Sequence, residues 1–286
     1  MARSSALTKF PVYAWFGIVL IIVFWILNWT LDGLRTHILF FPQWLGYCLF
    51  IDGLVYVRKG TSLLNRSVKR YIGLYIISAP VWWLFELLNA GTQNWIYLAR
   101  DQFTNLEYFL YATLDFSTVI PAVFGTAEFV STFSWVKFSK PVKIFKSNHM
   151  TVAIFFILGW IMLALMLTWP NYLYVFMWIS IFFIIDPINF WLGNRTLVEY
   201  SGRKNWKPMI ALAIGCLICG FFWEMWNFYA YPKWIYDVPG LNYFHIFEMP
   251  LTGYLGYIPF SFELFGIYHL LTRTRSGLGS YYVELE

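Results

Sequence analysis

Long apolar stretches alternate with short polar segments along the whole chain. Eight of the stretches reach the length of about 20 residues that a helix needs to cross the hydrocarbon of a membrane. They cover residues 11–31, 38–57, 71–90, 107–133, 152–169, 172–192, 208–230 and 243–271. The fourth contains Pro121, and the eighth contains Pro250 and Pro259, so we expect kinks or breaks in both. The pattern predicts an all-α integral membrane protein of about eight transmembrane helices.

Composition agrees with this fold class. Of the 286 residues, 59% are hydrophobic and only 12% are charged, whereas soluble domains contain about 25% charged residues. Too few polar side chains exist to cover a water-facing surface, so membrane lipid is expected to contact the protein directly. The net charge of +5 favours an anionic membrane leaflet as the partner rather than nucleic acid.

The basic residues predict the orientation. All but three of the 20 lysines and arginines lie before the first stretch, after the eighth, or in alternate segments between them. The exceptions are Arg35, Arg100 and Lys233. By the positive-inside rule both termini lie in the cytoplasm, which we expect to be bounded by a bacterial inner membrane. A cleaved signal peptide is the alternative for the first stretch, but that stretch is long and lacks a small-residue cleavage site.

Short motifs recur in the same order in both halves of the chain, at offsets of 134 to 139 residues. We therefore expect two four-helix repeats, residues 1–140 and 141–286, in the same orientation and with a seam between them. The matched pairs are Ile51-Asp52 with Ile185-Asp186, Ser62-Leu63-Leu64 with Thr196-Leu197-Val198, Glu86-x-x-Asn89 with Glu224-x-x-Asn227, Trp95-Ile96-Tyr97 with Trp234-Ile235-Tyr236, and Ile120-Pro121-x-x-Phe124 with Ile258-Pro259-x-x-Phe262.

Acidic residues stand out inside the apolar stretches. An acid near the bilayer centre costs about 2.5–3.5 kcal/mol, so such residues are expected to face protein or water. The stretches contain no basic residue to pair with them. Each acid must therefore be protonated, accept hydrogen bonds, reach an interface or bind a cation. Apart from Glu107, the first residue of the fourth stretch, eight acids lie inside the stretches: Asp52, Glu86, Asp115, Glu128, Asp186, Glu224, Glu248 and Glu263.

The predicted topology places several of these acids towards the outer face. Glu86, Glu224, Asp115 and Glu248 are therefore our candidates for acid/base catalysis. Candidate substrate-binding residues lie one helical turn away or among the neighbouring aromatics: Asn89, Asn227, Trp83, Trp223, Trp226, Tyr229 and His245. The alternative is that each Glu–Asn pair only forms hydrogen bonds that hold neighbouring helices together. For Asp52 and Asp186, close to basic loops, the favoured interpretation is that each snorkels to the interface or caps a helix end.

Metal and cofactor chemistry is only weakly indicated. His245 and Glu248 have a spacing compatible with a metal ion, and Glu86 or Glu224 could complete a mixed site. With four histidines in the chain, histidine-rich oxygenase chemistry is excluded. No nucleotide, diphosphate or hydrolase motif occurs, so the sequence indicates no particular cofactor.

Three functions remain open at the level of the sequence. The first is a membrane-embedded enzyme that acts on a lipophilic substrate, a lipid or an isoprenoid, by acid/base chemistry in an aromatic pocket. The second is a transporter of protons, cations or a small solute. The third is a structural or assembly subunit of a membrane complex. The sequence does not indicate an oligomeric state.

Overall fold

The computed structural model describes residues 9–136, 146–240 and 243–286 of the chain. Within these residues, seven segments are long and apolar enough to cross a membrane, which is compatible with a polytopic membrane protein. They are α1 (Val12–Thr30), α2 (Thr36–Lys59), α4 (Val68–Thr92), α5 with α6 (Asn105–Phe116 and Val119–Ser131), α7 (His149–Thr168), α8 through η3 to α9 (Pro170–Leu173, Tyr174–Phe176 and Met177–Leu192), and α11 (Lys207–Phe228). The prediction of a nearly all-α fold of apolar helices is confirmed. The predicted boundary between the halves, at residue 140, lies outside the described residues.

The fourth predicted stretch is broken where its proline predicts. Helix α5 ends at Phe116 and α6 begins at Val119, so Pro121 lies in the first turn of α6. A proline is tolerated there because the first N–H groups of a helix have no intrahelical acceptor. The break leaves Asp115 in the last turn of α5.

The eighth stretch departs further from the prediction. Its first half is not helical: it forms two short strands, β3 (His245–Ile246) and β4 (Met249–Pro250), and the 3₁₀ segment η4 (Leu251–Gly256). The helix α12 (Tyr257–Thr272) follows and has only 16 residues, short of the roughly 20 that a spanning helix needs. Two prolines and two glycines within residues 250–259 oppose a continuous helix. An eighth span therefore stays a prediction.

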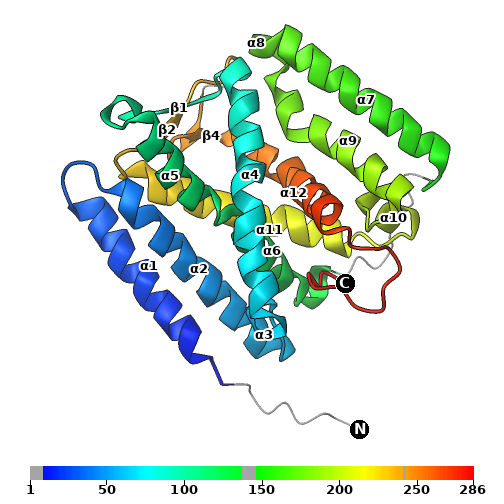
Figure 1. Ribbon diagram of the computed structural model, residues 1–286, viewed down its shortest axis with the longest axis horizontal. Coiled ribbons are helices and arrows are strands. Elements are labelled where there is room, and N and C mark those ends of the chain that lie inside the picture. The colour runs from blue at the N-terminus through cyan, green and yellow to red at the C-terminus, as the bar shows by residue number, and fades with distance from the viewer. Residues whose placement is uncertain (1–8, 137–145, 241–242) are drawn as a thin grey trace.

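The helices form two flanks around a central group. Figure 1 shows α1 and α2 on one flank, α7 and α9 on the opposite flank, and α4, α6, α11 and α12 between them. Close backbone contacts hold these elements together. A Cβ added to Gly17 of α1 would lie 2.6 Å from the Gly46 carbonyl oxygen of α2, and one added to Gly215 of α11 would lie 2.7 Å from the Ala127 nitrogen of α6. The contact at Gly215 joins the first half of the chain to the second.

The strands β1 (Trp95–Tyr97) and β2 (Trp234–Tyr236) follow α4 and α11 and pair antiparallel at one end of the helices (Figure 1). Ile96 lies opposite Ile235. The Asn89 side-chain amide bonds the backbone of Trp95 through both its polar atoms, and Asn227 does the same with Trp234. Each asparagine thus fixes a strand to the end of the preceding helix.

Short helices occupy the other end of the molecule. Asp52 accepts from the backbone N–H of Leu64 in α3 (Leu63–Arg66), and Asp186 accepts from those of Leu197 and Val198 in α10 (Leu197–Gly202). Of the two interpretations left open for these aspartates, snorkelling and capping of a helix end, the structure shows capping. The remaining short elements are η1 (Arg100–Gln102) and η2 (Ser134–Val136).

Two of the acids pair with a basic residue that lies outside the apolar stretches. Glu128 of α6 pairs with Arg66, which extends from α3, and also accepts from the Glu284 N–H of the C-terminal segment. Glu248 pairs with Lys233 because it lies in the turn between β3 and β4 rather than in a helix.

Candidate functional site

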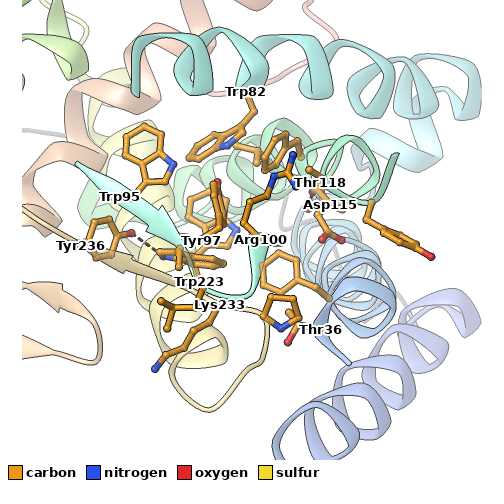
Figure 2. Close-up of a pocket in the computed structure, with 18 of the residues that line it drawn as sticks. Thr36, Trp82, Trp95, Tyr97, Arg100, Asp115, Thr118, Trp223, Lys233 and Tyr236 are labelled. Atoms are coloured by element: carbon orange, nitrogen blue, oxygen red, sulfur yellow. Dashed lines mark hydrogen bonds between the residues drawn. The ribbon is translucent and has the colours of Figure 1, made fainter. Parts of the chain in front are cut away.

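A cavity of about 170 Å³ lies between the two halves, next to the β1–β2 pair (Figure 2). Side chains from α2, α4, α5 and α6 line it together with side chains from α9, α11, η4 and α12. The lining is dominated by aromatic rings: Phe40, Trp82, Trp95, Tyr97, Phe103, Tyr108, Tyr111, Phe116, Trp178, Trp223, Trp234, Tyr236, Tyr257 and Phe260. Such a concave, largely apolar space with a few polar groups is typical of a binding site for a small molecule.

Glu86 lies behind this aromatic wall. Its Oε1 accepts from the Trp82 indole N–H at 2.9 Å, from the Trp95 indole N–H at 3.1 Å and from the Tyr97 hydroxyl. All three donors line the cavity, whereas Glu86 does not. One carboxyl oxygen therefore fixes the orientation of three aromatic side chains of the wall.

Glu224 does the same on the other half. Its Oε1 accepts from the hydroxyls of Tyr236 and Tyr257, each at 2.7 Å, and Tyr236 in turn accepts from the Trp234 indole N–H at 2.9 Å. Glu224 is fully buried, at 0% exposure. Burial, together with the neighbouring glutamates, raises the pKa of the Tyr97 and Tyr236 phenols well above its usual value, so both keep the protons that they donate.

Asp115 differs from both glutamates because it lines the cavity itself. Helix α5 begins with a capping box between Thr104 and Glu107 and carries Asp115 in its last turn, beside the backbone of Phe41 in α2. Its Oδ1 is buried and has no hydrogen-bond partner among the described residues. Figure 2 shows Asp115 and Lys233 on opposite sides of the cavity.

His37, in the first turn of α2, also lines the cavity. Its ring lies 4.7 Å from that of Tyr111 and 5.3 Å from that of Phe103. Its Nδ1 is buried and finds no hydrogen-bond partner within the described part of the chain. Because Tyr111 precedes Asp115 by one turn of α5, the imidazole and the carboxyl face the cavity from neighbouring positions. The sequence marks His37 only by its place at the end of an apolar stretch, and we did not predict it.

Two basic residues line the cavity, and both have partners. The Arg100 guanidinium donates to the Phe103 carbonyl oxygen at 3.0 Å and to the Asn105 side chain at 2.6 Å, and it stacks 4.1 Å from the centre of the Tyr108 ring. Lys233 donates to the Phe228 carbonyl oxygen and forms its ion pair with Glu248. Glu248, predicted as a catalytic acid, thus neutralises a lysine at the edge of the cavity.

The structure separates the predicted substrate-binding residues. Trp223 lines the cavity. Asn89 and Asn227 instead hold the strands β1 and β2. Trp83 packs on Phe109 and donates a hydrogen bond to Thr113 of α5. Trp226 is buried between Trp25 and Trp44. Tyr229 is 58% exposed, and His245 is exposed in β3. Of the predicted set, only Trp223 and Asp115 therefore contact the cavity.

Within the described ranges, no three His, Cys, Asp or Glu side chains form a group that could hold a metal ion. His245 and Glu248 therefore share a metal-compatible spacing without a third ligand among these residues.

Neither a protein-family model, a curated protein nor a solved structure matches this chain. The geometry of the cavity is what carries the functional assignment. A carboxyl and an imidazole in a largely apolar space can exchange a proton with a bound molecule, and the low polarity around them strengthens their electrostatic effect on it.

Proposed function

We propose that the protein is a membrane-embedded enzyme that acts on a lipophilic substrate, a lipid or an isoprenoid, by acid/base chemistry. The observation that carries this proposal is Asp115: a carboxyl oxygen without a hydrogen-bond partner among the described residues, in the wall of an aromatic cavity. Burial of a polar group without a hydrogen bond is unfavourable in free energy, and such groups are found mainly at functional sites. In this scheme Asp115 gives a proton to the substrate or takes one from it.

His37 is the second proton-transfer group of the proposed site. It lines the same cavity and has a ring nitrogen to which the described residues donate no hydrogen bond. Histidine titrates near neutral pH, so it is suited to return the proton that Asp115 exchanges. Glu86 and Glu224 take a different part from the one expected: they position the aromatic wall and do not touch the substrate.

We also propose that the two halves, residues 1–140 and 141–286, are repeats in the same orientation and that the cavity lies at their seam. Equivalent residues make equivalent bonds, as Asn89 and Asn227 do with their strands. The central pair of the β1–β2 ribbon, Ile96 with Ile235, joins matched positions, as a two-fold axis between the halves requires. Both features support the repeat.

The same proposal places the protein in the inner membrane of a bacterial cell, with both termini in the cytoplasm. The distribution of lysine and arginine supports this orientation. The cavity then lies towards the outer face, because β1 and β2 follow the outward ends of α4 and α11.

Transport of protons or cations is the second candidate. It is favoured by a pair of buried groups on α12, deeper in the bundle than the cavity. Neither oxygen of Glu263 and neither ring nitrogen of His269 has a hydrogen-bond partner in the part of the chain that the structure describes. Titratable groups of this kind are typical of proton pathways through membranes.

The enzyme proposal is tested with the purified chain in liposomes made from a total bacterial lipid extract. We expect the unmodified protein to convert at least one lipid, detected by untargeted mass spectrometry. Asp115→Asn keeps the size of the side chain but cannot exchange a proton, so the rate should fall by about 100-fold or more. Asp101→Asn, the same change at an exposed position of η1, should leave it unchanged.

Equal conversion by Asp115→Asn would refute the catalytic part of Asp115. Proton uptake by the same liposomes, without lipid conversion and dependent on Glu263, would favour transport. If neither occurs, the structural alternative is left.

A further inference from the structure

Five polar atoms of the aromatic wall are turned away from the cavity, onto the glutamates behind it. The indole N–H groups of Trp82 and Trp95 and the hydroxyl of Tyr97 are all directed onto Glu86, and the hydroxyls of Tyr236 and Tyr257 onto Glu224. Neither glutamate lines the cavity. Over this part of the wall, a bound molecule therefore meets ring surface rather than hydrogen-bond donors. The faces of aromatic rings carry negative potential, and a cation is the group that they attract.

The charges around the cavity favour the same kind of ligand. Asp115 is in the wall, and Glu86 and Glu224 lie directly behind it. The positive charge of Lys233 is offset by Glu248, and Arg100 is engaged with Phe103, Asn105 and the ring of Tyr108. Three carboxyls thus surround the cavity, and a bound cation would stabilise their ionised form. The cavity also has one arginine that no carboxylate pairs with among the described residues.

We infer that the cavity binds a quaternary ammonium group. Such a group has no N–H to donate, so ring faces can surround most of it and no hydrogen bond is left unmade. Its positive charge matches the aromatic faces and the unpartnered Asp115 oxygen at the same time. The inference rests on the proposed function and names the substrate class of the same site: a lipophilic molecule that carries a quaternary ammonium group.

Binding alone tests this inference, without an activity assay. The purified full-length chain in uncharged detergent is titrated with decyltrimethylammonium, decanol and decanoate, and its tryptophan fluorescence is followed. The three probes share one chain and differ in the charge of the head. We expect decyltrimethylammonium to bind about tenfold more tightly than either of the others, a ratio within the range of cation–aromatic interactions.

Variants identify the groups responsible. Asp115→Asn should reduce the preference for the cation to less than about threefold, because it removes the carboxyl that a bound cation would ionise and keeps the ring faces. Trp223→Leu should reduce it further, and Trp223→Phe should retain part of it. The matched control Asp101→Asn should behave like the unmodified protein. Tetramethylammonium chloride should displace the decyltrimethylammonium probe. Displacement at concentrations similar to that of the probe would indicate that the natural ligand is a free ammonium compound. Displacement only at far higher concentrations would indicate that the natural ligand is a lipid.

Equal binding of all three probes, tighter binding of decanoate, or no displacement by tetramethylammonium would overturn the ammonium inference. The proposed function would survive these results, because a lipophilic chain would still occupy the cavity. Binding of none of the probes would instead contradict the proposed function together with the inference.

Discussion

At the scale of single residues, the carboxyl of Glu86 fixes the orientation of three aromatic side chains in the cavity wall. Three donors converge on its Oε1. Glu86→Gln keeps an oxygen acceptor at this position, so we expect the free energy of unfolding to change by no more than about 1 kcal/mol. Glu86→Ala leaves the three donors without their acceptor and should cost about 1–3 kcal/mol.

Thermal unfolding in detergent measures both changes. Asp101→Asn, at an exposed position of η1, serves as the control for the loss of a carboxyl. Comparable unfolding temperatures for the Ala and Gln variants would show that the convergent bonds do not stabilise the fold.

The roles of some of these residues could be predicted from the sequence and the roles of others could not, for a physical reason. For Asp52 and Asp186, capping of a helix end was one of two interpretations that the sequence allowed, because a helix cap depends on a short stretch of chain. Glu86 and Glu224 were located, but their part was not, since it depends on where the tryptophans and tyrosines of β1 and β2 fold back. His37 contacts the cavity only through the packing of α2 on α5, which no local pattern encodes.

At the scale of elements, the β1–β2 ribbon joins the two halves at the edge of the cavity. Ile96 and Ile235 are directly opposite each other, and Ile96 is 44% exposed. Opposite residues of antiparallel strands have Cα atoms about 4.5–5.5 Å apart, within the range of a disulfide. We expect Ile96→Cys with Ile235→Cys to form a disulfide under mild oxidation, seen by mass spectrometry of the peptides.

The pair Ile72→Cys with Ile235→Cys is the control, because Ile72 lies near the opposite end of α4. The three native cysteines are buried and should not interfere. Cross-linking in the control at the same rate, or none in the opposite pair, would contradict the register of the ribbon. If the ribbon must move to admit a ligand, the disulfide should also slow the binding of decyltrimethylammonium.

The eighth stretch shows where apolar composition alone misleads. Residues 243–256 are hydrophobic enough to be read as part of a helix, yet they form β3, β4 and η4. Composition reports that a segment is apolar, whereas the prolines and glycines decide its backbone. In the fourth stretch a single proline broke the helix, as predicted. In the eighth, Pro250, Gly253, Gly256 and Pro259 act together and remove half of it.

At the scale of the whole molecule, the fold class and the positions of seven apolar segments could be predicted because length and hydrophobicity fix them. The cavity could not. It exists because elements far apart in the sequence meet: α11 packs closely on α6 at Gly215, and β1 pairs with β2. Such contacts depend on the packing of complete helices, and a single sequence does not specify it.

The orientation in the membrane decides from which side the proposed ligand reaches the cavity. Single cysteines at the exposed positions Asn65 and Lys204 lie at the end of the molecule with α3 and α10, whereas Gln102 and Tyr243 lie at the end with β1 and β2. Because the basic segments should remain in the cytoplasm, a membrane-impermeant thiol reagent added to intact cells should label Gln102→Cys and Tyr243→Cys only. Asn65→Cys and Lys204→Cys should react after the cells are opened. Labelling of Asn65→Cys but not Lys204→Cys in intact cells would place α3 and α10 on opposite sides of the membrane. That result would refute the parallel repeat together with the packing of the two halves that forms the cavity.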